Sequence, residues 1–420
     1  MAMRIAWRRY WRLLFVLAFG VRLTAAFMLD GFRSPETFEY ENLARSMLAG
    51  KGFVYKHLDV VYYSFAAPLY SWMCAAVYAA GGTVGTVLLL QMMLSASQAV
   101  LVARMAEELF QTTRAGMVAG FLVAVHPGLI VYASSKLHPL TVDAVVFSLA
   151  LWLFWRLNAT PSWTRAVVAG LVVGIGALTR STVVVFLPIG ALWSLWTHGR
   201  ERWLTLVSRW VVAGLCAAMV IMPWSVRNTL IHGKFVWMLT TDSEVFWRGN
   251  NPAATGHSYV NGYSIELDTL TPNKRHDLLH QRNELTQAHW FLAEAIDFIR
   301  SNPTTFVRLT IMKFYRFWWF SSQSGLLYRH NWLVAYRAFY VLVLVLGALG
   351  IWSLVRQRDV RALAQVALLV LFLLALSALQ SLYYVEVRHR WAVEPLLLVL
   401  AGGSGAWLSH RWQPERETAR

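Results

Sequence analysis

Three glutamates lie close together in a chain that has few acids. Glu36, Glu39 and Glu41 fall within the stretch RSPETFEYENLARSMLAG, while the 420 residues include only 22 Asp and Glu against 38 Lys and Arg. A carboxylate that reaches an attacking hydroxyl or amine is a candidate general base. The stretch directly follows a long hydrophobic segment, so these acids are expected to stand at a membrane surface.

Cations and hydrogen-bonding groups occupy other short polar segments between hydrophobic blocks. Guanidinium and ammonium groups bind phosphate well, and a nearby carboxylate takes up a proton. If these segments meet at one face, they suit a substrate that carries a lipid-linked phosphate and a polar group to be activated. The candidate residues are Lys136, His138, Arg180, Arg227, Asn250, Asn251, Arg388 and Arg390.

The composition predicts the environment of these residues. Hydrophobic residues make up 57% of the chain and charged residues 14%, whereas a soluble domain has about 25% charged residues. The blocks at 11–29, 86–103, 339–355 and 363–379 approach the length that crosses a hydrocarbon core of roughly 30 Å. The sequence therefore predicts an all-α polytopic membrane protein.

The positive charges mark one side of the membrane. The formal net charge is +16, but Lys and Arg form short clusters between apolar blocks, which is typical of cytoplasmic loops and does not indicate nucleic-acid binding. The first block lacks a cleavage site and is expected to remain as an anchor. Both termini are expected in the cytoplasm. Cys74 and Cys216 lie in apolar surroundings and predict no redox or metal framework.

Alternation of the blocks gives about ten transmembrane helices. Residues 1–224 form a transmembrane module whose first external loop is 30–82, and 225–330 form a second external loop with juxtamembrane helices. Residues 331–420 supply the C-terminal transmembrane helices. Within the first loop, the block at 65–82 contains Pro68 and many small residues, so it is expected to lie in the interface or to re-enter.

Six segments, in sequence order, resemble bacterial GT-C glycosyltransferases of the protein O-mannosyltransferase and lipid A aminoarabinose transferase type. The resemblance runs from about residue 10 to about residue 405. It implies a GT-C fold, a polyprenyl-phosphate sugar donor, inverting transfer on the external or periplasmic face, and a bacterial inner membrane. The segments are PETFEYENLARSMLAGKGF, APLYSWMCAAVY, GALTRSTVVVFLP, PWSVRNTLIHGKFV followed by WRGNNPAATG, IRSNPTTFVRLTIMKFYRFWW, and RHRWAVEPLLLVLAG.

The resemblance also assigns roles to residues. The family's catalytic Asp in the first external loop falls on Glu36, which departs from the pattern by one methylene; Asp30 and Glu39 are the alternatives. Arg388 and Arg390 match the family's paired arginines before the last helix and are expected to bind the lipid phosphate. A second set is expected in supporting positions: Arg180 and Arg227 for the phosphate, and Tyr40, Lys136, His138, Asn250 and Asn251 on the acceptor and loop side.

Each assignment has a purely structural alternative. Ser34, Pro35 and Glu36 also fit an N-cap, a first-turn proline and a dipole-favoured acid, and Glu39 and Glu41 also serve helix solubility. The arginines before the last helix would also anchor it at lipid headgroups, and GNNPAATG also fits a tight turn. Asp143, inside an apolar helix, is expected to pair with Lys136 or Arg180, or to contribute to the site.

No cofactor is expected. His276 and His280 have zinc-compatible spacing, but the sequence offers no third ligand, so no metal is predicted, although a divalent ion is not excluded. The expected partners are the lipid-linked sugar donor, a lipid, glycan or protein acceptor and the bilayer, with the chain as a monomer. A transporter or flippase of a lipid-linked substrate, which would place ionisable groups at mid-membrane, and a non-catalytic lipid-binding relative are the alternatives.

Overall fold

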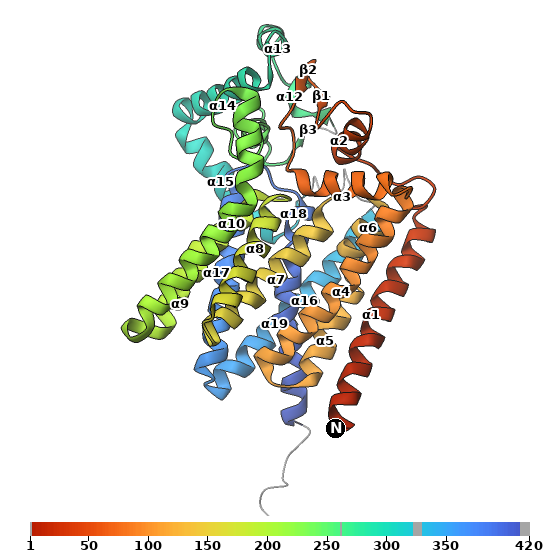
Figure 1. Cartoon of the computed structure of the whole chain (residues 1–420), viewed down its shortest axis with the longest axis vertical. Coiled ribbons are helices and arrows are strands. Elements are labelled where there is room, and N and C mark those ends of the chain that lie inside the picture. Colours follow the sequence, from red (N-terminus) through yellow and green to blue (C-terminus); the bar gives the residue numbers. More distant parts are fainter. Residues whose placement is uncertain (1, 261–262, 322–329, 412–420) are drawn as a thin grey trace, which may run out of the picture.

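Long helices run side by side and form a bundle, with shorter elements gathered at one end (Figure 1). This computed structural model describes residues 2–260, 263–321 and 330–411 and is 77% helix and 3% strand. We call the end that bears the short elements the loop face, and the other end the opposite face. Residues 322–329, within the expected 225–330 segment, lie outside the described residues.

Among the described residues, seven helices are long and apolar enough to cross a membrane, and one pair bent by 50° makes an eighth. The seven are α1 (Ala2–Met28), α4 (Val84–Phe110), α7 (Leu140–Ala159), α9 (Phe186–His198) with the preceding 3-10 turn η1 (Ser181–Val185), α10 (Trp203–His232), α16 (His330–Gln357) and α17 (Val360–Ser381). The bent pair is α5 (Thr113–Ala124) and α6 (Pro127–Ser135). A second 3-10 turn, η2 (Gly199–Arg202), precedes α10.

The other two expected spans are also helical. They are α8 (Trp163–Ala177) and α19 (Glu394–Arg411). α8 has only 15 residues, which at about 1.5 Å per residue is short for a membrane span. All ten positions that the sequence predicts as spans are therefore helices, although fewer have the full length and apolarity of a membrane span.

The break between α5 and α6 has a local cause. Pro127 has no amide hydrogen and disfavours a helical conformation in the residue before it, so α5 ends and a new helix begins. His126 caps α6, with Nδ1 accepting a hydrogen bond from the Leu129 amide at 3.2 Å. The short helix α6 then leads to the Lys136–Pro139 connection at the loop face.

The loop face is built from two segments of the chain. The first contains α2 (Glu39–Leu48), strands β1 (Tyr55–His57) and β2 (Val60–Tyr62), and α3 (Pro68–Ala79), which lies across the ends of the long helices (Figure 1). The second contains α11 (Asp242–Gly249), β3 (Tyr259–Val260), β4 (Tyr263–Ser264), α12 (Ile265–Asp268), α13 (Pro272–Leu279), α14 (Glu284–Ser301) and α15 (Pro303–Trp318), and α18 (Val387–Trp391) joins them before α19.

A buried carboxylate fastens the two segments to each other. Glu284 accepts hydrogen bonds from the amides of Tyr63 and Ser64 at 2.8 and 3.2 Å and from Thr240 Oγ1 at 2.6 Å. His232, at the end of α10, places Nε2 3.2 Å from the same carboxylate. Since a buried acid is stable only when its oxygens are bonded, these contacts fix the first loop segment over α10 and α14.

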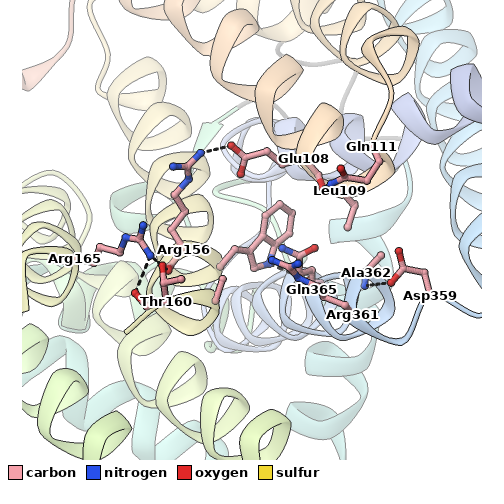
Figure 2. Close-up of a pocket in the computed structure, with 12 residues that line it drawn as sticks. Glu108, Leu109, Gln111, Arg156, Thr160, Arg165, Asp359, Arg361, Ala362 and Gln365 are labelled. Atoms are coloured by element: carbon pink, nitrogen blue, oxygen red, sulfur yellow. Dashed lines mark hydrogen bonds and ion pairs between the residues drawn. The ribbon is translucent and has the colours of Figure 1, made fainter. Parts of the chain in front are cut away.

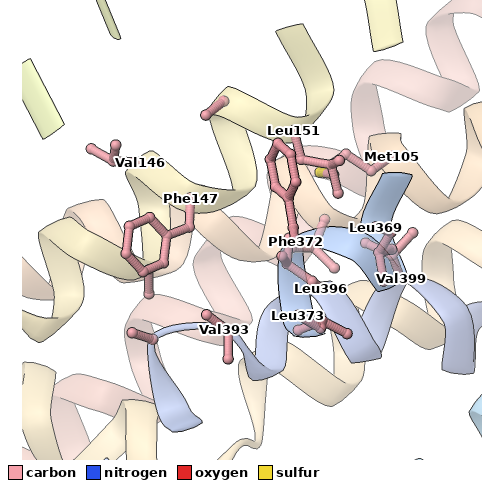
Figure 3. Packing of buried hydrophobic residues seen from close by; sticks show 14 of the residues in the cluster. Met105, Val146, Phe147, Leu151, Leu369, Phe372, Leu373, Val393, Leu396 and Val399 are labelled. Atoms are coloured by element: carbon pink, nitrogen blue, oxygen red, sulfur yellow. The ribbon is translucent and has the colours of Figure 1, made fainter. Parts of the chain in front are cut away.

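The core below the loop face is apolar and closely packed. Phe372 of α17 stacks on Phe186 of α9 with ring centroids 3.6 Å apart, and side chains of α4, α7, α17 and α19 interdigitate around it (Figure 3). α16 and α19 approach closely because Gly350 has no side chain: a Cβ there would lie 2.1 Å from the Leu400 carbonyl oxygen. This packing holds fixed the helix ends that carry the polar residues.

Candidate functional site

A polar cluster lies where the two loop segments meet the ends of α7, α8 and α18. We define the polar cluster by six residues that are connected because charged members shift the pKa of others: Glu39, Tyr40, His138, Arg180, Arg388 and His389. The charges of Glu39, Asp143, Arg180 and Arg388 all act on the Tyr40 hydroxyl. The first loop, α7 and the segment before α19 therefore contribute to the same cluster. The structure therefore brings together one acid of the opening stretch and cations from distant parts of the sequence.

Glu39 is the acid that faces these cations. It is the first residue of α2 and is half-buried. Burial raises the pKa of its carboxyl, while Arg388, Arg248 and His57 act in the opposite direction. Within the described part of the chain, Glu39 forms no ion pair, so its carboxylate is held near cations without being neutralised by direct contact.

His138 stands between the first loop and the cations. Its ring contacts those of Tyr40, Phe38 and Tyr132 edge-on, at centroid distances of 6.0, 5.3 and 5.2 Å. Nδ1 accepts a hydrogen bond from the Leu140 amide at 3.1 Å. Burial, together with the charges of the surrounding cations, lowers the pKa of His138 well below its ordinary value. His138 is therefore neutral at neutral pH and carries its proton on Nε2.

Arg388 lies on the side of the cluster opposite α2. Its Nε is 2.7 Å from Glu386 Oε2, and its side chain keeps 21% exposure. Ser258 donates a hydrogen bond to the other oxygen of Glu386. Next to it, the pKa of His389 is lowered well below its ordinary value by burial and by the charges of Arg388 and Arg180. The guanidinium is thus oriented by a buried acid, and its side chain stays partly exposed.

Arg180 connects the cluster to an apolar cleft. Its Nε lies 3.0 Å from Oδ2 of Asp143, whose side chain is 1% exposed, which confirms one of the two pairings expected for this acid. Arg180 and His389 also line a narrow cleft with Phe147, Phe317, Leu376 and Val393. The cleft therefore has apolar walls and a basic end.

Glu36 occupies a different position from Glu39. Its backbone pairs with the segment before α7: the Glu36 amide donates to the Ser135 carbonyl and the Leu137 amide to the Glu36 carbonyl, each at 2.9 Å. Its side chain is 54% exposed and forms an ion pair with Lys136. Because the charge of Lys136 acts on His138, Glu36 is at the edge of the polar cluster, joined to it through Lys136. Asp30 is exposed in the turn that follows α1.

Arg390 does not face the cluster as its neighbour Arg388 does. It is fully buried, with Nε bonded to Glu394 Oε1 at 2.5 Å, Nη1 to the Phe317 carbonyl at 3.1 Å and Nη2 to Tyr336 at 2.8 Å. His126 and Tyr336 also bond to Glu394. We call Arg390, Glu394, His126 and Tyr336 the buried network. All three guanidinium nitrogens are occupied, so in this structure Arg390 positions α18 and cannot reach a phosphate.

Three other expected site residues have backbone partners. Arg227 donates to the Tyr63 carbonyl and packs on Trp224, so it holds the first loop at the end of α10. Asn250 donates to the carbonyls of Phe246 and Leu382 at 2.8 and 2.7 Å, and Asn251 donates to the Trp247 carbonyl at 2.8 Å. Both asparagines are buried. They shape the turn after α11, as the alternative interpretation of GNNPAATG expects.

Three residues that the sequence did not single out complete the surroundings of Glu39. His57 of β1 lies 3.1 Å from Glu244 of α11, and Arg248 donates to the same carboxylate at 2.7 Å. Both His57 and Arg248 affect the pKa of Glu39. His57 and Glu244 are far apart in the sequence, and no local pattern connects them. Only Arg248, directly before the Gly-Asn-Asn turn, lay in a segment that the sequence marked.

No three His, Cys, Asp or Glu side chains group as metal ligands within the described ranges. His276 and His280 stack with ring centroids 3.8 Å apart on α13, away from the polar cluster residues in sequence and exposed to solvent.

Comparisons with known proteins agree with this architecture. The sequence model of the dolichyl-phosphate-mannose-protein mannosyltransferase family matches residues 66–226. No curated protein sequence matches the chain.

Solved structures match nearly the whole chain. Two are of the oligosaccharyltransferase AglB from Archaeoglobus fulgidus, one with an inhibitory peptide and a dolichol-phosphate and one tethered to an acceptor peptide; each has 12% identity and a TM-score of 0.56 over 96% of this chain. The chain spans only about half of their length, 51% and 50%. ArnT from Cupriavidus metallidurans bound to undecaprenyl phosphate has 16% identity and a TM-score of 0.46, over 94% of this chain and 77% of its own.

The family match spans α3 to α10, which includes Lys136, His138 and Arg180 of the site. The fold match extends to the first loop and to the helices after α15. The chain therefore has the GT-C fold, and its residues 66–226 are similar to the dolichyl-phosphate-mannose-protein mannosyltransferase family.

Proposed function

We propose that this chain is a membrane glycosyltransferase that transfers a sugar from a polyprenyl-phosphate donor to a lipid, glycan or protein acceptor. The observation that carries the proposal is the position of Glu39: this half-buried acid has no ion pair in the described chain, and the charge of Arg388 acts on its carboxyl, close to an apolar cleft that Arg180 also lines. A proton acceptor and an anion site within one cluster are what glycosyl transfer from a phosphate requires.

The cleft marks a route for the donor. Its volume is only about 20 Å³ in this structure, so it would have to widen for an apolar isoprenoid chain to lie along Phe147, Phe317 and Leu376 while the phosphate reaches Arg180 and Arg388 at the loop face. Guanidinium groups stabilise a phosphate oxyanion through charge-assisted hydrogen bonds. The negative charge that develops on the leaving phosphate would therefore be balanced by cations already in place.

Glu39 would act as the general base. The acceptor hydroxyl gives its proton to the carboxylate while its oxygen bonds to the anomeric carbon, and the bond from that carbon to the phosphate oxygen breaks. The polyprenyl phosphate leaves with the electron pair. A single displacement of this kind inverts the anomeric centre. Glu36, which matches the family position, remains the alternative base, with Lys136 as its partner.

The same proposal sets the orientation. Transfer would take place at the loop face on the external or periplasmic side of a bacterial inner membrane, with both termini in the cytoplasm and the chain acting as a monomer. The basic clusters at the opposite face, such as VRQRDVR at 355–361, support this orientation because cytoplasmic loops are enriched in Lys and Arg.

The test compares two isosteric variants in liposomes that contain a polyprenyl-phosphate sugar and a mixture of candidate acceptors. Glu39→Gln keeps the size of the side chain and removes the base, so we expect donor consumption to fall by about 10²- to 10⁴-fold. Glu36→Gln is the matched control and should keep most of the rate. A wild-type rate in Glu39→Gln, with loss in Glu36→Gln, would assign the base to Glu36; undiminished rates in both would end the proposal of a first-loop base.

A further inference from the structure

A second polar pocket, drawn in Figure 2, opens at the opposite face, at the ends of the long helices away from the polar cluster (Figure 1). It has a volume of about 470 Å³ and lies between the last turn of α4, the connection from α7 to α8 and the first turns of α17. Its floor contains Leu109, Trp155 and Ala362, and charged side chains stand around it. Nothing in the proposed transfer reaction uses this pocket.

Cations predominate in the pocket, and its acids are already engaged. Arg156, Arg165 and Arg361 line it, against Glu108 and Asp359. Glu108 is paired with Arg156 and also accepts a hydrogen bond from Trp152, while Asp359 caps α17 by accepting from the Ala362 amide at 2.9 Å. The lining thus has three positive and two negative groups, so one positive charge is left to be balanced.

The guanidinium of Arg361 is the group left without a partner. It is exposed, and within the described residues it forms no hydrogen bond or ion pair. Arg361 also lies in the first turn of α17, at the positive end of the helix dipole, where a cation is unfavourable unless an anion stands nearby. Arg165 uses Nη1 to bond the carbonyls of Arg156 and Thr160 at 2.9 and 2.7 Å, which leaves its other nitrogens available.

We propose that this pocket binds a phosphate group, held by Arg361 and Arg165. Two parallel donors on a guanidinium match two phosphate oxygens, and Arg is favoured over Lys for such contacts. A single negative charge on a phosphodiester balances the net charge of the lining. The phosphate can come from the headgroup of a lipid in the adjacent leaflet or from a soluble phosphate ester, and both have the same recognition chemistry.

The experiment measures ligand retention by the full chain in detergent, using native mass spectrometry and thermal shift. The probes are dioleoylphosphatidylglycerol for the lipid source, glycerol 3-phosphate for the soluble source and dioleoylglycerol as the probe without phosphate. Arg361→Gln should weaken binding of one phosphate probe by about tenfold, since it removes a charge-assisted contact. Which phosphate probe responds identifies the source of the phosphate.

A matched control separates a site from general surface charge. Arg358→Gln makes the same change three residues away, at an exposed position that does not line the pocket, and should leave binding unchanged. Arg361→Gln leaves no buried partner behind, so loss of folding does not obscure the result. Equal binding by wild type and Arg361→Gln, equal loss in Arg358→Gln, or equal retention of dioleoylglycerol would each overturn the proposal. Sugar transfer is expected to persist in Arg361→Gln, which keeps this test independent of the proposed reaction.

Discussion

Arg388 and Arg390 are two residues apart, yet the structure places them in opposite kinds of surroundings. Arg390 belongs to the buried network, where every guanidinium nitrogen has a partner. Arg388 is oriented by one acid and keeps 21% exposure beside Glu39, His138 and His389. A satisfied buried charge fixes a backbone, whereas an oriented and accessible charge is able to bind. The comparison predicts that Arg390 supports the fold and that Arg388 supports the reaction.

The largest expected effect comes from breaking the buried network. Arg390→Met leaves Glu394 buried without its main cation, so we expect a loss of about 3–5 kcal/mol in the free energy of unfolding, measured by denaturant titration in detergent. The double variant Arg390→Met with Glu394→Leu removes both charges and should recover part of the loss. If the single variant unfolds like wild type, Arg390 does not position α18.

Variants of Arg388 test whether this residue supports the reaction. Arg388→Gln should lower kcat for sugar transfer by about 10²- to 10³-fold, because the leaving phosphate loses a cation. Arg388→Lys keeps the charge without the planar fork and should restore part of the rate. Both are measured with a radiolabelled polyprenyl-phosphate sugar. An unchanged kcat in Arg388→Gln would move the phosphate site to Arg180.

A second buried cation, Lys313, should support the fold in the same way as Arg390, and its contribution can be measured through the pH dependence of stability. Lys313 of α15 is fully buried and bonds the Gly249 carbonyl and Asn250 Oδ1, each at 3.1 Å; burial lowers its pKa to about 7. Between about pH 7 and its unfolded pKa, the unfolded chain holds one more proton than the folded chain, so stability rises with pH by at most about 1.4 kcal/mol per unit.

Lys313→Met should remove this slope between pH 7 and 9.5, measured by unfolding at several pH values. Lys274→Met, which replaces a more exposed lysine paired with Glu294, is the control and should keep it. Equal slopes in wild type and Lys313→Met would contradict the lowered pKa.

The smallest expected effect is a shift in the pH dependence of kcat for sugar transfer. Burial raises the pKa of Glu39, so its carboxylate form appears only at higher pH. The rise of kcat on the acidic side of the profile, its acidic limb, should therefore occur at a higher pH than an ordinary glutamate would give. Arg248 favours the carboxylate, so Arg248→Gln should move the limb to still higher pH, while Arg248→Lys should not. A limb that stays in place would show that Glu39 is not the titrating base.

The sequence predicted the bundle well because the signal for it is local. Each apolar block predicts its own helix, and all ten expected spans are helical. The block at 65–82, which was expected to lie in the interface or to re-enter, forms α3 across the ends of the long helices (Figure 1). The pairing of Asp143 with Arg180 was also expected, since an acid inside an apolar helix requires a partner. The break between α5 and α6 at Pro127 was not predicted, and nothing in the sequence showed that His126 would cap α6 and bond Glu394.

The details of the site were harder to predict. Glu36 and Glu39 are separated by less than one helical turn, and only the entry geometry of α2 decides which of them faces Arg388. Likewise, the pattern Arg388-His389-Arg390 cannot show which arginine turns inward, because that depends on Tyr336 and Glu394 in other helices. Contacts between residues as distant as His57 and Glu244 depend on the folded loop segments, which no short motif describes.

α8 has a consequence for the membrane around the site. Its 15 residues span only about 22 Å, well short of a hydrocarbon core of roughly 30 Å. Ile175 and Leu171 on its surface are exposed, so lipid tails must cover a helix that is too short for them. Hydrophobic mismatch of this kind thins the adjacent leaflet. Headgroups would then sink toward Arg180 at the end of α8, and a lipid carrier would bring its phosphate to the protein without having to leave the bilayer.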